Sequence, residues 1–99
     1  MRVTVLEFAE RDIEEGFAFY ESRQPGLGGY FFDSIAADLD SLMLHAGIHR
    51  KVHGFHRLLA RTFPFAIYYE VAGDDARVWA VLDCRRDPAW IRHALSTRP

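Results

Sequence analysis

The sequence predicts an α+β fold in which a helical hairpin packs against one face of a largely antiparallel sheet. Three observations lead to this prediction. A short alternating segment opens the chain, two stretches with helical periodicity follow around a proline-glycine turn, and the second half alternates between apolar and polar residues. With 99 residues, of which 49% are hydrophobic and 26% charged, the chain suits one compact domain over residues 1–99.

The first half predicts a strand and two helices. The β-branched, alternating start predicts an edge strand at residues 2–7. An apolar stripe then recurs every three or four positions over residues 9–23, which predicts a helix that ends at QPGLGG. Its members are Ala9, Ile13, Gly16, Phe17 and Tyr20. A second helix is expected at residues 28–45, and the short loop makes the two helices antiparallel. Its expected core face consists of Phe31, Phe32, Ile35, Leu39, Leu42 and Met43.

The second half predicts a three-stranded antiparallel meander and a short C-terminal helix. GFHRLLARTF alternates until Pro64, which cannot donate to a strand ladder. FAIYYEV and RVWAVLD follow as strands joined by the loop AGDDA. Asp87 is a suitable N-cap and Pro88 suits the first helical position, so residues 88–96 are expected to be helical.

Composition limits the classes of function. One cysteine, Cys84, cannot form an internal disulfide, and the N-terminus lacks the pattern of a secretory signal, so we expect a cytoplasmic protein. No apolar run approaches the roughly 20 residues that span a bilayer, which argues against a membrane role. Residues 1–40 carry nine acidic side chains and three arginines, whereas residues 41–99 carry nine Lys or Arg and five acidic residues. This asymmetry suggests that the second half meets an anionic partner.

Several segments together resemble a known family. They are A-E-R-D-I at residues 9–13, the P-G-L-G turn, Y-F-F at 30–32, R-x-F-P-F-x-I-x-Y at 61–69 and C-R-R-D-P-x-W at 84–90. Their order and spacing resemble the RelE/ParE superfamily of bacterial toxins, closer to ParE, over nearly the whole chain. The resemblance implies the toxin of a type II toxin-antitoxin system, of the kind linked to plasmid stabilisation, neutralised by a ParD-like antitoxin.

The resemblance implies two possible activities. ParE-like toxins poison DNA gyrase, whereas RelE-like toxins cleave messenger RNA on the ribosome, and a non-toxic binding module is a third possibility. RNA cleavage needs a base, an acid and cations on one phosphate. The only lysine is Lys51, and His93 is the only histidine after Trp90, so the nuclease set looks incomplete. We therefore favour a non-catalytic gyrase inhibitor without a cofactor and without sequence-specific binding of nucleic acid.

Basic side chains are the candidates for binding the target. Arg57 and Arg61 are expected on one face of a strand, where they either clamp a phosphate or are simply solvated. Arg85 and Arg86 should point to opposite faces, so one joins this basic face while the other pairs with an aspartate or the C-terminal segment. The remaining candidates are His56, for phosphate contact or proton transfer, and Trp90, which either anchors the last helix or stacks on bases.

Other side chains suggest an antitoxin site and argue against a metal site. His45, His49 and His53 recur every four residues, but the intervening glycines favour a polar loop over a metal site. A second line on the helix at residues 28–45 combines small side chains with Tyr and Leu, which would let a partner helix approach closely. With one residue from the first helix, the antitoxin-binding candidates are Phe19, Tyr30, Ser34, Ala37, Ser41 and Leu44.

Overall fold

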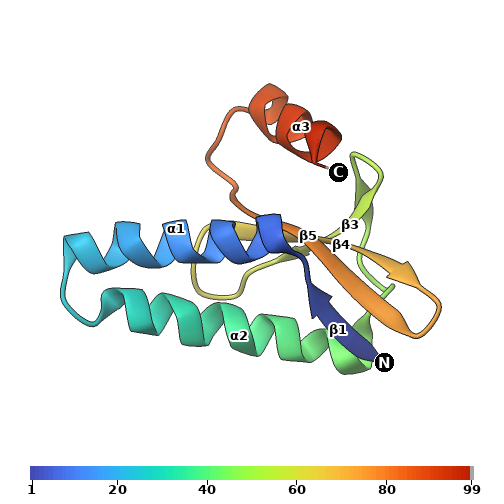
Figure 1. Ribbon diagram of the computed structural model, residues 1–99, viewed down its shortest axis with the longest axis horizontal. Coiled ribbons are helices and arrows are strands. Elements are labelled where there is room, and N and C mark those ends of the chain that lie inside the picture. The colour runs from blue at the N-terminus through green and yellow to red at the C-terminus, as the bar shows by residue number, and fades with distance from the viewer. Residues whose placement is uncertain (99) are drawn as a thin grey trace.

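The structure is a computed structural model that describes residues 1–98. Five strands form one sheet in the order β1-β5-β4-β3-β2, with three helices around it (Figure 1). The strands are β1 (Arg2–Val5), β2 (Lys51–Val52), β3 (Phe55–Leu59), β4 (Phe65–Ala72) and β5 (Asp75–Asp83). The helices are α1 (Glu7–Arg23), α2 (Leu27–His45) and α3 (Pro88–Thr97).

The predicted α+β class and the order of elements are confirmed. The predicted helices differ from α1, α2 and α3 by at most two residues at either end. The proline-glycine turn separates α1 from α2, and the Asp87 cap with Pro88 marks the start of α3. Two features of the sheet were not predicted. β1 is an edge strand as expected, but it pairs in parallel with β5, and residues 51–52 add a strand to the segment expected to be a loop.

α1 and α2 form an antiparallel hairpin that covers one face of the sheet (Figure 1). The turn between them is held by Glu21, whose carboxylate accepts hydrogen bonds from the backbone N–H of Gly26 at 3.1 Å and of Gly28 at 3.0 Å. These are orphan donors at the start of α2, where negative charge is also favoured by the helix dipole. Glu21 thus ties the end of α1 to the beginning of α2.

A β-bulge changes which residues of β5 face each side of the sheet. Tyr68 pairs with Ala80 but Tyr69 pairs with Val78, so Trp79 is an extra residue on β5. The bulge shifts the alternation of side chains along β5. Val81 and Val78 therefore both point to the α1–α2 side, although three positions separate them.

The two faces carry separate hydrophobic clusters. The larger one lies between the sheet and the α1–α2 hairpin and includes Ala9, Ile13, Phe31, Ile35, Leu42, Phe65, Ile67, Tyr69, Val78 and Val81. The smaller one lies under α3 and consists of Ala66, Tyr68, Ala80, Leu82, Ile91 and Leu95. Ile91 and Leu95, not Trp90, therefore anchor α3 on the sheet, because Trp90 is 40% exposed.

Three predicted core positions are in fact exposed. Phe32 and Met43 of α2 are 51% and 53% exposed, so the core face of this helix is narrower than predicted. Phe17, part of the predicted apolar stripe of α1, is also exposed. Among residues 1–98, no helix is both long and apolar enough to cross a membrane.

Candidate functional site

Arg57 lies on the α3 side of the sheet. It pairs with Tyr68 across β3 and β4, and Tyr68 belongs to the cluster under α3. Burial raises the pKa of the Tyr68 phenol above its usual value, and the nearby Arg57 guanidinium partly opposes this shift. Arg57 is thus a partly buried cation beside a buried hydroxyl group.

Arg61 does not share a strand face with Arg57, which corrects the sequence-based expectation. β3 ends at Leu59, and the loop after it turns toward α2. There the backbone N–H of Arg61 donates to the carboxylate of Asp38 at 3.3 Å. Asp38 is only 3% exposed, and burial raises the pKa of its carboxyl group. Arg57 contacts the α3 side, whereas Arg61 lies against the α1–α2 hairpin.

Arg85 is held by its neighbour Asp83 at the end of β5. Its side chain donates to both carboxylate oxygens, from Nε at 3.0 Å and from Nη2 at 2.7 Å. These bonds hold the pKa of Asp83 below its usual value, although burial acts in the opposite direction. Arg85 therefore takes the aspartate-paired role that was expected for one member of the Arg85-Arg86 pair.

Arg86 stacks on Trp90 instead of joining Arg57. Its guanidinium carbon lies 4.2 Å from the centre of the Trp90 ring system. The structure therefore does not bring Arg57, Arg61 and Arg85 together around one shared partner, as the expected phosphate clamp would require. Whether each of them binds a target remains a prediction.

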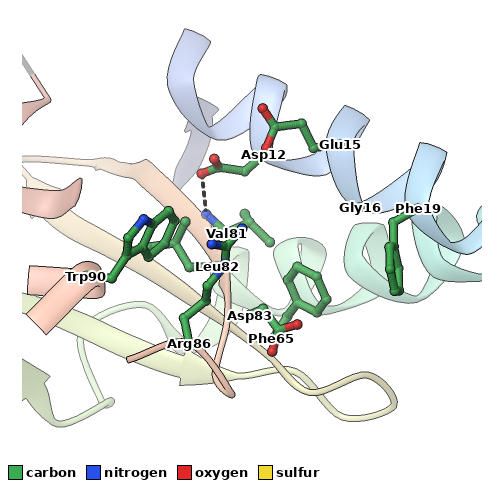
Figure 2. A pocket seen from close by; sticks show the side chains of 10 residues that line it. All are labelled: Asp12, Glu15, Gly16, Phe19, Phe65, Val81, Leu82, Asp83, Arg86 and Trp90. Atoms are coloured by element: carbon green, nitrogen blue, oxygen red, sulfur yellow. Dashed lines mark hydrogen bonds between the residues drawn. The ribbon is translucent and has the colours of Figure 1, made fainter. Parts of the chain in front are cut away.

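A pocket of about 210 Å³ lies where α1, the end of β5 and the start of α3 meet (Figure 2). Phe19 lines it from α1, and Arg86 and Trp90 line it from the opposite side. The carboxylates of Asp12, Glu15 and Asp83 also line it. The structure thus gathers one predicted antitoxin-binding residue and two predicted target-binding residues around a single concave site.

A second concavity is an apolar groove on the outer surface of the helical hairpin. It has a volume of about 400 Å³ and is lined by Ile13, Glu14, Phe17 and Phe32, which we call the hairpin groove. The exposed faces of two phenylalanines on adjacent helices offer a site for an apolar helix. This groove was not predicted from the sequence, because Phe17 and Phe32 were expected to face the core, whereas both are exposed.

The predicted antitoxin line on α2 lies next to the loop between β3 and β4. Tyr30 packs edge-to-face on Phe63 of this loop, with ring centroids 5.4 Å apart. Ser34 is half-buried and Ala37 is exposed. The Ser41 hydroxyl is turned back to the backbone carbonyl of Asp38 at 2.6 Å. Leu44, at 84% exposure, is the most accessible member of this line.

Two histidines, His49 and His56, lie against the buried Tyr69. The Tyr69 hydroxyl contacts Nδ1 of His49 and accepts a hydrogen bond from the N–H of Gly47 at 2.9 Å. His56 stacks on the Tyr69 ring, and its Nδ1–H donates to the carbonyl of His49 at 2.6 Å. Burial, with smaller contributions from His56 and His45, lowers the pKa of His49.

This cluster is structural in character. His56 uses Nδ1 for a backbone carbonyl and one ring face for Tyr69, so it is fixed against the core instead of facing an open site. Within residues 1–98, no group of three or more His, Cys, Asp or Glu side chains is arranged to hold a metal ion.

Comparison with known proteins supports the sequence resemblance at the level of the fold. No protein-family model matches the sequence, and no curated protein matches it. Among solved structures, a chain of the chromosomal ParDE TA system from P. aeruginosa superimposes with a TM-score of 0.74. The match covers 82% of this chain and 92% of that chain, at 17% sequence identity. The resemblance predicted from the sequence is confirmed to this extent: the chain has a ParE-like fold.

Proposed function

We propose that this protein is the toxin of a type II toxin-antitoxin system, held inactive by a cognate antitoxin and acting in the cytoplasm by poisoning DNA gyrase. The observation that carries the proposal is the ParE-like fold combined with an exposed apolar hairpin groove. A chain of this size rarely leaves several aromatic side chains exposed on one helical hairpin unless a partner covers them.

The chemistry of the groove favours an amphipathic partner helix. Phe17 and Phe32 supply apolar surface, and Glu14 lies at the same site. Other exposed carboxylates of α1 are those of Glu7, Glu10 and Glu15. A helix with one apolar face and flanking Lys or Arg residues would complement both features. We therefore assign the antitoxin to the hairpin groove, and to the neighbouring residues Phe19, Tyr30 and Leu44.

Binding, and not RNA cleavage, is the favoured mode of action. Cleavage of RNA without a bound cofactor requires an acid, a base and cations around one scissile phosphate. Here the three arginines do not converge on one site: Arg57 lies beside Tyr68, the backbone N–H of Arg61 donates to Asp38, and Arg85 is paired with Asp83. His56 is engaged by the backbone and by Tyr69. This arrangement supports inhibition by protein-protein contact, for which no acid-base set is needed.

Two experiments test the proposal. Co-expression with the adjacent open reading frame should yield a stable complex, and expression of the chain alone should stop growth. Purified chain incubated with gyrase, ATP and supercoiled plasmid should then accumulate cleaved DNA. Harmless expression without a co-purifying partner would overturn the toxin assignment. Cleavage of messenger RNA on ribosomes, with gyrase unaffected, would replace the gyrase mechanism with a RelE-like one.

A further inference from the structure

The segment around β2 and β3 contains basic residues but no acidic ones. Residues 41–69 contain four Lys or Arg and four His but no Asp or Glu. Three of the four Lys and Arg residues lie within residues 50–57, which comprise Arg50, β2, its turn and most of β3 and which we call the basic hairpin. It projects at the end of the molecule remote from the α1–α2 turn (Figure 1). The net charge of −2 for the whole chain conceals this local concentration.

In the described part of the chain, the Lys and Arg side chains of this segment form no ion pair with a carboxylate. Within residues 1–98, the ion pairs involve Arg11, Arg77, Arg85, Arg98 and the N-terminal amine. None of them includes a Lys or Arg from residues 41–69. Four of the eight Lys and Arg side chains outside this segment are thus ion-paired, whereas none of the four inside it is.

Cross-strand pairing places the cations next to one another. Lys51 pairs with His56, and one position further along, the N–H of Arg57 donates to the carbonyl of Arg50 at 3.0 Å. Arg50 and Arg57 therefore lie opposite each other, and like charges in this arrangement are destabilising by themselves. An anion bound between them would remove this repulsion, so the arrangement points to a ligand and not only to solvation.

The backbone holds this ribbon in a defined shape. At the turn, His53 and Gly54 have φ angles of 55° and 86°, as the two central positions of a tight, twisted hairpin require. A non-glycine residue in this region is uncommon and costs about 1 kcal/mol. Two-stranded ribbons of this kind fit against the grooves of nucleic acid duplexes.

The apolar residues of the hairpin argue against a membrane as its partner. Val52 is half-buried, and Phe55 packs with the cluster under α3. The exposed tip therefore offers no aromatic or leucine side chain to insert among lipids. Arginine binds phosphate oxygens in a bidentate manner, and closely spaced cations match the repeating phosphates of a polynucleotide.

We propose that the basic hairpin binds the phosphate backbone of duplex nucleic acid without reading its sequence. The contacts come from Arg50, Lys51 and Arg57, and the base edges take no part. This activity depends on neither the antitoxin nor gyrase, so it stands or falls separately from the proposed function.

Fluorescence anisotropy with a labelled 20-base-pair DNA of random sequence tests the proposal, with the purified full chain at pH 7.5 and increasing salt. The variant Arg50→Gln/Lys51→Gln is compared with Arg2→Gln/Arg23→Gln, which removes two unpaired cations from other surfaces. We expect the hairpin variant to bind at least tenfold more weakly at low salt. Its log-log salt slope should be smaller by about 2, because each lost phosphate contact removes about 0.9.

The controls separate a loss of binding from a loss of folding, and nucleic acid from other anionic partners. Thermal unfolding should be the same for both double variants, since all four side chains are exposed. Equal binding of an RNA duplex supports the proposal, because the phosphodiester backbone is shared. Three results would overturn it: no binding at about 50 mM salt, equal losses in both double variants, or equally strong binding to polyglutamate or to anionic vesicles.

Discussion

Asp12 and Arg98 form a buried bidentate ion pair although 86 positions separate them in the sequence. The Arg98 guanidinium donates to the two Asp12 oxygens at 2.6 and 2.8 Å. Each partner also bonds to the backbone of β5: the Asp12 carboxylate accepts from the N–H of Val81, and Arg98 donates to the carbonyl of Trp79, both at 3.0 Å. Together they join α1, β5 and the end of α3.

The Asp12–Arg98 ion pair lies along a part of β5 that has no neighbouring strand on its outer edge. β1 accompanies β5 only as far as Val78, so the outer edge of β5 beyond this residue has no neighbouring strand. Asp12 and Arg98 satisfy the donor of Val81 and the acceptor of Trp79 that such a strand would otherwise bond. The pair thus protects a sheet edge while fixing α3 over the opposite face.

Removing either Asp12 or Arg98 should therefore lower the free energy of unfolding. Asp12→Ala leaves the Arg98 guanidinium and the Val81 N–H without their acceptor, and the expected loss of stability is about 3 kcal/mol. Urea denaturation measures this loss, and a double-mutant cycle with Arg98→Ala should show coupling above 1 kcal/mol, within the ~0.5–3 kcal/mol range of contacting pairs. The matched control is Arg11→Ala, which breaks an exposed pair with Glu7 and should cost less than about 0.5 kcal/mol. Equal effects at both sites would contradict this account.

Close approach of α1 and α2 depends on Gly16. A Cβ atom at this position would lie 2.6 Å from two atoms of the buried Phe31 ring. Gly16→Ala should thus destabilise the fold by about 1 to 3 kcal/mol despite the better helix propensity of alanine. Gly29→Ala is the control, because a Cβ there meets nothing within 4 Å and should leave stability unchanged or raised by up to about 1 kcal/mol.

A second substitution checks the cause. Gly16→Ala combined with Phe31→Leu should be less destabilised than the sum of the two single variants, because the smaller side chain relieves the contact. Strict additivity of the two free energies of unfolding would show that the contact is not the origin of the loss.

Asp38 should make stability depend on pH in the acid range. Burial raises the pKa of this carboxyl group in the folded state above the ordinary value of 3.8. Its stabilising contribution is therefore fully present below pH 3.8 and is lost as the pH rises through the raised pKa. Asp38→Asn removes this loss, so the variant should gain stability relative to wild type as the pH increases toward neutrality.

Measuring the free energies of unfolding of both proteins at several pH values isolates this single group, because all other carboxyl groups are common to both. A stability difference that does not change with pH would contradict the raised pKa. Asp40→Asn serves as a control, since Asp40 lies on the same helix and is exposed.

The elements with strong local signals were predictable from the sequence. Asp87 caps α3 as expected, since its carboxylate accepts from the N–H of Ala89 at 2.7 Å, and Pro88 begins the helix. The two residues of β2 carry no periodicity of their own and pair only because the turn at His53 and Gly54 folds them back. The parallel pairing of β1 with β5 likewise depends on tertiary structure and has no local signature.

The candidate site was less predictable for related reasons. Phe31 and Phe32 are adjacent and equally apolar, so only the direction in which α1 crosses α2 decides which of them is buried. Arg57 and Arg61 have the spacing of one strand face, but the strand ends between them. No local pattern could connect Asp12 with Arg98, and the pocket lined by Phe19 and Trp90 forms between α1 and α3, which are far apart in the sequence.

The final prediction separates antitoxin binding from toxicity. Phe17→Ser and Phe32→Ser alter exposed side chains of the hairpin groove, so they should weaken antitoxin binding at least tenfold while growth inhibition persists. Arg61→Ala and Arg85→Ala should instead reduce growth inhibition, with melting temperature and antitoxin affinity near wild type, because both side chains are exposed. Arg57→Ala should act in the same direction with a small loss of stability, since Arg57 is partly buried. Titration calorimetry with the antitoxin and growth curves after induction measure the two properties. Arginine variants that stay fully toxic would move the effector surface to the pocket of Arg86 and Trp90.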